Sequence, residues 1–290
     1  MAIPQNLSNQ LIKEYFKIAI LLTCHNRKAE TITCLSSLFS IDAKLDIFLV
    51  DDGSTDGTKE AIEIEFPNVQ IIEGTGDLFW NRGMNLAWAE ASKQAYDFYV
   101  WLNDDVQVYP DFLEELLACS TVSSYKSIIS GIIEDKNTGI TIYGGYDTQR
   151  KLISVNGKMN SIHHMNGNVV LVPKYVFEQL GNLDYRFHHD LGDVDYGLRA
   201  KKKGIDVFTT RKSIAHGKPN PISRMRQNNA SIGQRLKRLY SPLGSNPFIN
   251  FHFRKRHKGL FNATFYFAFQ HLLNMIPDRL NTLIFKKKHQ

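Results

Sequence analysis

The stretch IFLVDDGSTDGTKEAIEIEF, residues 47–66, carries the pattern that decides the fold. It opens with four apolar residues, turns through Asp51-Asp52-Gly53, and continues as a segment predicted to be a helix over residues 55–66. Further strands and helices are predicted on either side of it: strands at 18–22, 69–72 and 98–102, and helices at 29–39 and 81–95. Short apolar strands that alternate with helices predict an α/β fold with a mostly parallel sheet covered on both faces.

Polar residues stand at the end of each predicted strand. The three ends read His25-Asn26-Arg27, Asp51-Asp52-Gly53-Ser54 and Asn103-Asp104-Asp105. Ligands bind at the carboxyl ends of the strands in sheets of this kind. The sequence therefore predicts a binding site along this edge of the sheet.

The regular alternation of strands and helices ends at about residue 115. Shorter strands joined by Gly-rich or Asn-rich turns follow, with two further helices: strands at 128–133, 140–143, 169–172 and 207–209, and helices at 175–180 and 193–203. We interpret residues 116–220 as a second half of the same domain, added to the same sheet, and residues 221–290 as a separate tail.

Charge is distributed very unevenly along the 290 residues. The chain carries a formal net charge of +6, yet residues 1–198 hold 15 Lys and Arg against 27 Asp and Glu, whereas residues 199–290 hold 20 against 2. A basic tail indicates a phosphate-rich partner, either nucleic acid or an anionic membrane surface. Three cysteines without metal or redox spacing, and a polar start to the chain, favour a cytoplasmic protein.

The tail contains a helical segment at residues 260–276 that is rich in Phe and Leu. Asn262, Tyr266, Gln270 and Asn274 form a polar ridge along it. Basic clusters lie before it, at residues 254–256, and after it, at residues 286–288. Such a helix is typical of the membrane interface, so we expect residues 254–290 to meet an anionic membrane surface. The alternative is a helix packed on the protein's own core.

Two adjacent carboxylates, Asp104 and Asp105, follow the strand at residues 98–102. They repel each other and need a cation or a proton. Carboxylates together with a diphosphate suit Mg²⁺ or Mn²⁺. Asp51 and Asp52 can accept hydrogen bonds from a base edge or a ribose hydroxyl, although the same residues also suit a turn and a helix cap.

A third acidic group opens the helix predicted at residues 193–203. Asp195 and Arg199 are four residues apart and can pair on one face, which leaves Asp193 to take a proton from an acceptor hydroxyl. Both aspartates would equally complement the helix dipole. His216 follows the strand at residues 207–209, and a lone histidine is more often structural than a ligand.

Several motifs in order resemble the inverting nucleotide-sugar glycosyltransferases of family 2, which have the GT-A fold. They are LLTCHNR, VDDGSTDGT, GDLFWNRGMN, WLNDDV, MNGNVVLVP with LGNLD, and GDVDYGLRAKKKG, spread over residues 17–220. The pattern around Trp80 and Asn85 resembles a rhamnosyltransferase-like branch that builds bacterial surface polysaccharides. Residues 1–115 would then be the nucleotide-sugar-binding half, and residues 116–220 the acceptor-binding and catalytic half.

The resemblance implies a role for each matching residue. Asp193 would be the catalytic base, with Gly192 in the place of the usual Glu. Asp105 and His216 would bind the metal ion, Mg²⁺ or Mn²⁺. The nucleotide-sugar-binding residues would be Thr23, Arg27, Asp51, Asp52, Trp80, Asn85, Asn103 and Asp104.

The expected partners are a UDP- or dTDP-linked sugar and a glycan or lipid-linked glycan acceptor, with the protein peripheral on the cytoplasmic face of the inner membrane. Two other functions are weighed against this one. A sugar-nucleotidyltransferase would carry a Gly-rich phosphate loop after its first strand, and LLTCHNRKAE has no glycine. A nucleic-acid-binding protein would use the basic tail, with Tyr240 and Phe248 among the aromatics that stack on bases, but the tail matches no recognition module and we expect no nucleic-acid partner.

Overall fold

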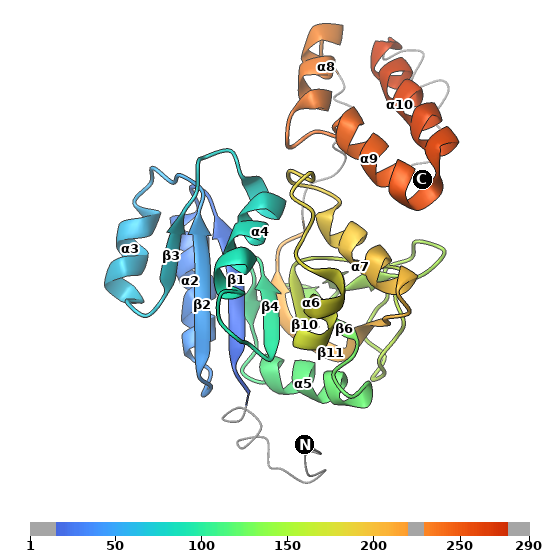
Figure 1. Ribbon diagram of the computed structural model, residues 1–290. Helices are drawn as coiled ribbons and strands as arrows, with labels where there is room; N and C mark the ends of the chain where they lie inside the picture. Colours follow the sequence, from blue (N-terminus) through green and yellow to red (C-terminus); the bar gives the residue numbers. More distant parts are fainter. Residues whose placement is uncertain (1–15, 220–228, 278–290) are drawn as a thin grey trace. The chain divides into compact units, whose positions relative to one another are not determined.

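The computed structural model describes residues 16–219 and 229–277 (Figure 1). They divide into two compact units. The sheet unit contains the described residues up to Tyr185 together with Gly192–Pro219, and the C-terminal unit contains Arg186–Leu191 and the described residues from 229 onward. The predicted basic cluster at residues 286–288 lies outside the described residues.

The first half of the sheet unit has the predicted parallel arrangement. Its strands are β1 (Ile18–Cys24), β2 (Leu45–Asp51), β3 (Gln70–Glu73) and β4 (Phe98–Leu102), and its helices are α2 (Lys28–Phe39), α3 (Thr58–Glu65) and α4 (Phe79–Ala91). Strand β1 pairs in parallel with both β2 and β4, and β2 with β3. Helix α3 begins three residues later than predicted, because Asp56 accepts hydrogen bonds from the Thr58 backbone N–H and hydroxyl just before the helix.

The second half of the unit continues the same sheet with mixed strand directions. It contains β5 (Gln107–Val108), α5 (Phe112–Val122), β6 (Ile128–Asp135), β7 (Thr141–Tyr143), β8 (Gly145–Tyr146), β9 (His164–Met165), β10 (Val169–Pro173), α6 (Lys174–Leu180), α7 (Gly192–Lys202) and β11 (Val207–Gly217). The strand order is β3-β2-β1-β4-β10-β6-β11-β5, with β7 paired to β6. Strand β10 runs antiparallel to both of its neighbours.

The strand at residues 207–209 is longer than predicted and extends to Gly217. Its continuation is polar and therefore does not have the apolar pattern of a buried strand. Arg211 and Lys212 point to acidic partners on another element: Arg211 pairs with buried Glu115 of α5 at 2.7 Å, and Lys212 pairs with Asp111. These long-range ion pairs stabilise a strand that local hydrophobicity does not indicate.

Both faces of the sheet are buried, as the continuous apolar strands predict. Alternate residues of β1 enter opposite cores: Ile18, Ile20 and Leu22 pack on one side, and Ala19 and Leu21 on the other. Large aromatic side chains of α4, β4 and α7 fill the second core, where Trp88, Trp101 and Tyr196 are almost fully buried. This packing fixes the strand ends that carry the polar residues.

The C-terminal unit is helical, with α8 (Ile232–Tyr240), α9 (Pro247–Lys258) and α10 (Leu260–Met275). Ser231 forms a capping box with Gln234 at the start of α8, and Asn246 caps α9. Helix α10 lies within one residue of the helical segment predicted at residues 260–276. None of the helices in residues 16–219 and 229–277 has the length and apolar character needed to cross a bilayer.

Candidate active site

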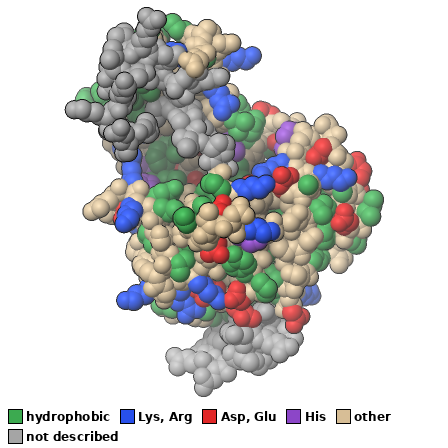
Figure 2. All heavy atoms as spheres, turned by 180° about the vertical axis from the view of Figure 1, so that it is seen from behind, with side chains coloured by type: hydrophobic (Ala, Val, Ile, Leu, Met, Phe, Trp, Pro, Cys, Tyr) green, Lys and Arg blue, Asp and Glu red, His purple; other side chains and the backbone are tan. Residues whose placement is uncertain are grey.

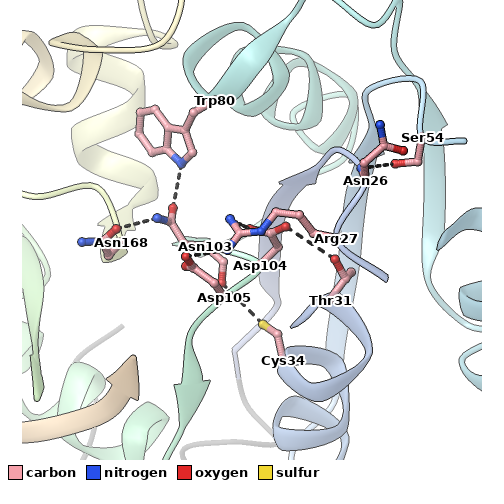
Figure 3. Close-up of polar contacts among 10 residues, drawn as sticks. All are labelled: Asn26, Arg27, Thr31, Cys34, Ser54, Trp80, Asn103, Asp104, Asp105 and Asn168. Atoms are coloured by element: carbon pink, nitrogen blue, oxygen red, sulfur yellow. Dashed lines mark hydrogen bonds and ion pairs between the residues drawn. The ribbon is translucent and has the colours of Figure 1, made fainter. Parts of the chain in front are cut away.

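The polar turns after β1 and β4 meet at one edge of the sheet. The guanidinium of Arg27 lies 3.1 Å from an oxygen of Asp104 and 2.9 Å from an oxygen of Asp105 (Figure 3). The two predicted acidic residues therefore share one cation, which comes from a turn 77 residues earlier in the chain. The adjacent carboxylates need such a counter-charge, because they would otherwise repel each other.

Asp104 is the more deeply buried of the two carboxylates, at 5% exposure. Burial raises its pKa to about 7; Arg27 opposes this shift, and Asp105 adds to it. The hydroxyl of Thr31, in α2, lies 3.5 Å from a carboxylate oxygen of Asp104. Near neutral pH this residue is therefore balanced between its neutral and its charged form.

The pKa of Asp104 predicts a pH-dependent stability difference between the wild type and Asp104→Asn. Because the folded-state pKa lies above the unfolded value, folding binds a proton between about pH 4 and pH 7, and wild-type stability falls as the pH rises through that window. The variant lacks this loss. The free energy of unfolding is measured in urea at several pH values. The variant's value minus the wild type's should increase from about pH 4 to about pH 7 and stay constant above that range. A constant difference would contradict the burial argument.

Asn103, the first residue of the acidic motif, holds two other segments together. Its side-chain oxygen accepts a hydrogen bond from the indole N–H of Trp80 at 2.7 Å, and its amide nitrogen donates to Asn168 (Figure 3). An amide side chain can both accept and donate in this way, whereas an ionised aspartate only accepts. Asparagine therefore suits this position, because it links Trp80 of α4 to Asn168, the residue before β10.

Asp193, the predicted base, lies in the first turn of α7. One of its carboxylate oxygens accepts the backbone N–H of Gly167 at 2.8 Å. A side chain at position 167 would meet both the Trp80 ring and the Cβ of Asp193. The backbone of Gly167 is therefore packed between the indole and the predicted base, which places Asp193 and Trp80 in one site.

Packing at the start of α7 explains why residue 192 is a glycine, where the family motif usually has a glutamate. A Cβ on Gly192 would lie 1.7 Å from the side-chain oxygen of Asn81, whose amide nitrogen donates to the backbone oxygen of Asp184. No side chain fits there without displacing Asn81. The predicted pairing of Asp195 with Arg199 is confirmed, at 2.9 Å, with Asp195 fully buried.

The remaining predicted nucleotide-binding residues are held by the surrounding backbone. Asp52 is 3% exposed and accepts three backbone N–H groups, from Gly76, Leu78 and Phe79, so it shapes the loop before α4. Asp51, also buried, accepts the N–H of Ser54.

Thr23 and Asn85 contact other elements. Thr23 packs against Gly83, where a Cβ would lie 2.3 Å from the threonine hydroxyl. Asn85 donates to the backbone oxygen of Leu183. It lies about 140° around α4 from Trp80, so it braces the loop before α7 and does not join the group around Asn103.

His216 lies in β11, beside the residues that follow the acidic motif. Its ring packs on Tyr109, with centroids 5.7 Å apart, and its Cα is paired with that of Gln107. Burial lowers the pKa of its imidazole, with Lys136 acting in the same direction. Across the part of the chain that the structure describes, no three His, Cys, Asp or Glu side chains gather into a metal site.

The donor set nevertheless fits a divalent cation that brings its own phosphate ligands. Asp104 and Asp105 already surround a positive group, the Arg27 guanidinium. Mg²⁺ and similar ions usually take one or two carboxylates and complete their coordination with substrate phosphate and water. A site of this type is incomplete until the nucleotide is bound.

Four residues that contact the site were not predicted from the sequence: Thr31, Asn81, Gly167 and Asn168. Gly167 and Asn168 lie in the motif MNGNVVLVP, which carried the family resemblance without an assigned role. Their contacts reach β4, α4 and α7, so nothing local in the motif indicates them.

The chain matches the model of glycosyl transferase family 2 over residues 19–178, more than half of its length. It belongs to glycosyl transferase family 2. The match covers the strand ends with Arg27, Asp104 and Asp105, and also Gly167 and Asn168.

A curated relative supports the assignment. The N-acetylglucosaminyl-diphospho-decaprenol L-rhamnosyltransferase of Mycobacterium tuberculosis (strain CDC 1551 / Oshkosh) is 23% identical over 227 residues, which is 66% of this chain and 72% of the relative. The same enzyme of strain ATCC 25618 / H37Rv matches equally well.

Solved structures show the fold. The mannosyltransferase PcManGT from Pyrobaculum calidifontis, in complex with GDP-Man and Mn²⁺, aligns with a TM-score of 0.57 at 12% identity, covering 95% of this chain and 76% of its own. TarS from S. aureus aligns with a TM-score of 0.57 at 11% identity, and the alignment covers 89% of this chain and 54% of the TarS chain. The predicted GT-A fold is confirmed.

This family 2 chain is therefore a glycosyltransferase. The nucleotidyltransferase and nucleic-acid-binding alternatives are set aside. The structures of PcManGT, with GDP-Man and Mn²⁺, and of GalNAc-T7, with UDP, GalNAc and Mn²⁺, both contain a divalent metal.

Proposed function

We propose that this glycosyltransferase is metal-dependent and inverting, and that it transfers a sugar from a UDP- or dTDP-linked donor to a hydroxyl of a glycan or lipid-linked glycan. The observation that carries the proposal is the continuous set of contacts from Arg27 and Asp104-Asp105, through Asn103 and Trp80, to Asp193. These contacts support a site that combines a carboxylate pair for a cation with a separate carboxylate for the base.

Asp193 is the proposed general base. It takes the proton of the acceptor hydroxyl as that oxygen forms a bond to the anomeric carbon, and the bond from this carbon to the diphosphate breaks on the opposite face. The hydrogen bond from the Gly167 N–H orients the carboxylate. The Trp80 ring packs against Gly167 and forms a wall of the proposed site.

Asp105 is the proposed metal ligand, and Asp104 lies beside the ribose or diphosphate. A bound Mg²⁺ or Mn²⁺ would stabilise the charge that develops on the leaving diphosphate. A bound cation would take the place of the Arg27 guanidinium between the two carboxylates, and Arg27 would then be available to the nucleotide. His216 has a lowered pKa, so its ring is neutral near pH 7, the form that binds metal, and we retain it as a proposed second ligand.

Asp51 and Thr23 are the proposed nucleotide contacts at the end of β1 and β2, with Asp52 holding the loop that shapes their site. The acceptor proposal draws on the curated relative, whose name specifies a lipid-linked acceptor and a rhamnosyl donor group. Synthesis of bacterial surface polysaccharide on such an acceptor would bring this chain to the cytoplasmic face of the inner membrane.

A thermal-shift screen of UDP-, dTDP- and GDP-sugars, each with and without Mg²⁺ or Mn²⁺, tests the proposal. A donor at about 100 times its Kd stabilises the folded state by about 2.7 kcal/mol, which raises Tm by several degrees. We expect one nucleotide class to do so only when metal is present. Wild-type protein that responds to none of these mixtures would refute the proposal.

A further inference from the structure

Helix α10 packs into the C-terminal unit with its polar side. Gln270 and Asn274, from the predicted polar ridge, are both fully buried. The Gln270 amide donates to the backbone oxygen of Ser245 at 2.7 Å, and the Asn274 amide donates to the backbone oxygen of Gln270 at 2.8 Å. The ridge is thus committed to contacts inside the unit.

The opposite side of α10 is apolar and exposed. Phe261 is 88% exposed, Phe265 65%, Leu272 59% and Met275 52%. With the exposed Ala268, they recur every three or four residues and form one continuous strip, which we call the outer strip. Single exposed apolar residues are ordinary, but a contiguous row of large ones marks an interaction surface.

Cations precede the outer strip closely in the chain. Residues 229–277 contain seven Lys and Arg and no Asp or Glu. Lys255 and Lys258, both exposed, end α9 immediately before Phe261. By contrast, acidic and basic side chains are mixed on the face of the sheet unit that Figure 2 shows.

Contacts between side chains fasten the basic end of α9 to the start of α10. Gly259 takes a positive φ of 87° between the two helices. Arg254 bonds the side-chain oxygen of Asn262 at 2.8 Å, and its guanidinium lies 3.3 Å from the centroid of the Tyr266 ring. The cationic end of α9 is therefore fastened to the start of α10.

We propose that the outer strip of α10 docks on the surface of an anionic lipid bilayer, with Lys255 and Lys258 against the head groups. An aromatic helix with neighbouring cations and no acid lies in the interface of such a membrane. A second copy of the chain would instead oppose two surfaces of the same charge. Helix α10 has 16 residues, about 24 Å of rise, and so lies on the bilayer without crossing it.

Docking would bring the enzyme to a lipid-linked acceptor, and in this respect the inference rests on the proposed function. The C-terminal unit also includes Arg186–Leu191, and the chain passes directly from this segment into Gly192 and Asp193. The unit that contacts lipid is thus covalently continuous with the segment that carries the proposed base.

Co-sedimentation of the full chain with vesicles tests the proposal. Wild-type protein should bind vesicles containing phosphatidylglycerol, bind pure phosphatidylcholine weakly, and lose affinity at high salt. Phe261→Gln with Phe265→Gln should weaken binding to the anionic vesicles at least about tenfold, because two large apolar groups no longer enter the interface. Lys255→Glu with Lys258→Glu should weaken it as well.

Ile64→Gln is the matched control, because Ile64 is 80% exposed on α3 of the sheet unit. It should bind vesicles as the wild type does. All variants should keep the wild-type Tm and the same donor-induced thermal shift, which separates a failure of docking from a failure of the proposed function. Three results would overturn the proposal: unchanged vesicle binding by the double Phe variant, binding of single-stranded RNA but not of vesicles, or a strip-dependent dimer that ignores lipid.

Discussion

Asp193→Asn should lower kcat by about 10²–10⁴-fold while leaving donor binding nearly unchanged. The substitution keeps an oxygen that can accept the Gly167 N–H, which Asp193 accepts at 2.8 Å. It replaces the other oxygen, which accepts the Val194 N–H at 2.7 Å, by an amide nitrogen that cannot take a proton. Turnover is measured as nucleotide diphosphate released in the presence of acceptor, and donor binding by the metal-dependent thermal shift. Asp42→Asn, a change at an exposed residue of the same unit, should behave as the wild type.

The neighbouring acid provides a contrast for this prediction. Asp195→Asn removes the charge of a fully buried carboxylate that pairs with Arg199, whose side chain is 21% exposed. The loss of one partner of a buried pair costs up to about 3–5 kcal/mol. That variant should therefore lose stability, whereas Asp193→Asn should lose turnover at an unchanged Tm. If Asp193→Asn turns over as fast as the wild type, Asp193 is not the base.

Asp105→Ala should lower kcat/KM at least about 100-fold and abolish the metal-dependent shift with donor. A metal clamp stabilises transition-state charge by several kcal/mol, and each 1.36 kcal/mol corresponds to a factor of ten in rate. The same change removes one of the two carboxylates that hold Arg27, at 2.9 Å. Titration with Mn²⁺ at a fixed donor concentration measures the loss.

Because Arg27 has a second partner, Asp105→Ala should affect metal and donor binding without unfolding the protein. Without Asp105, the guanidinium still has Asp104 at 3.1 Å, so the fold should survive and the unliganded Tm should change little. Arg27→Ala tests the same pair from the other side: it should weaken nucleotide binding while metal-dependence remains. Metal-independent activity of the wild type at full rate would contradict the role of Asp105.

Local sequence pattern accounts for the strands that are buried on both faces. The strand at residues 98–102 was predicted with its observed bounds, and β1 and β2 within two residues. Helices α2 and α7 were predicted within one residue at each end. Continuous apolar runs and helical periodicity are local properties, so they can be read without the fold.

Elements stabilised by distant partners were harder to predict. Helix α5 was not predicted, nor were the short strands β5, β8 and β9. Polar residues 210–213 of β11 join the sheet through contacts such as Arg211 with Glu115, 96 residues away. A strand of this kind has no local signature, because its stability comes from pairing and ion pairs.

By itself, the sequence determined that acidic and amide side chains end the parallel strands, since strand direction and apolar pattern place them at one edge. Only the tertiary structure decided which of them meet: Arg27 with Asp104 and Asp105, and Asn103 with Trp80 and Asn168. It also decided that the polar side of α10 faces inward. Periodicity gives a helix two faces, but the neighbours that pack against it determine which face is buried.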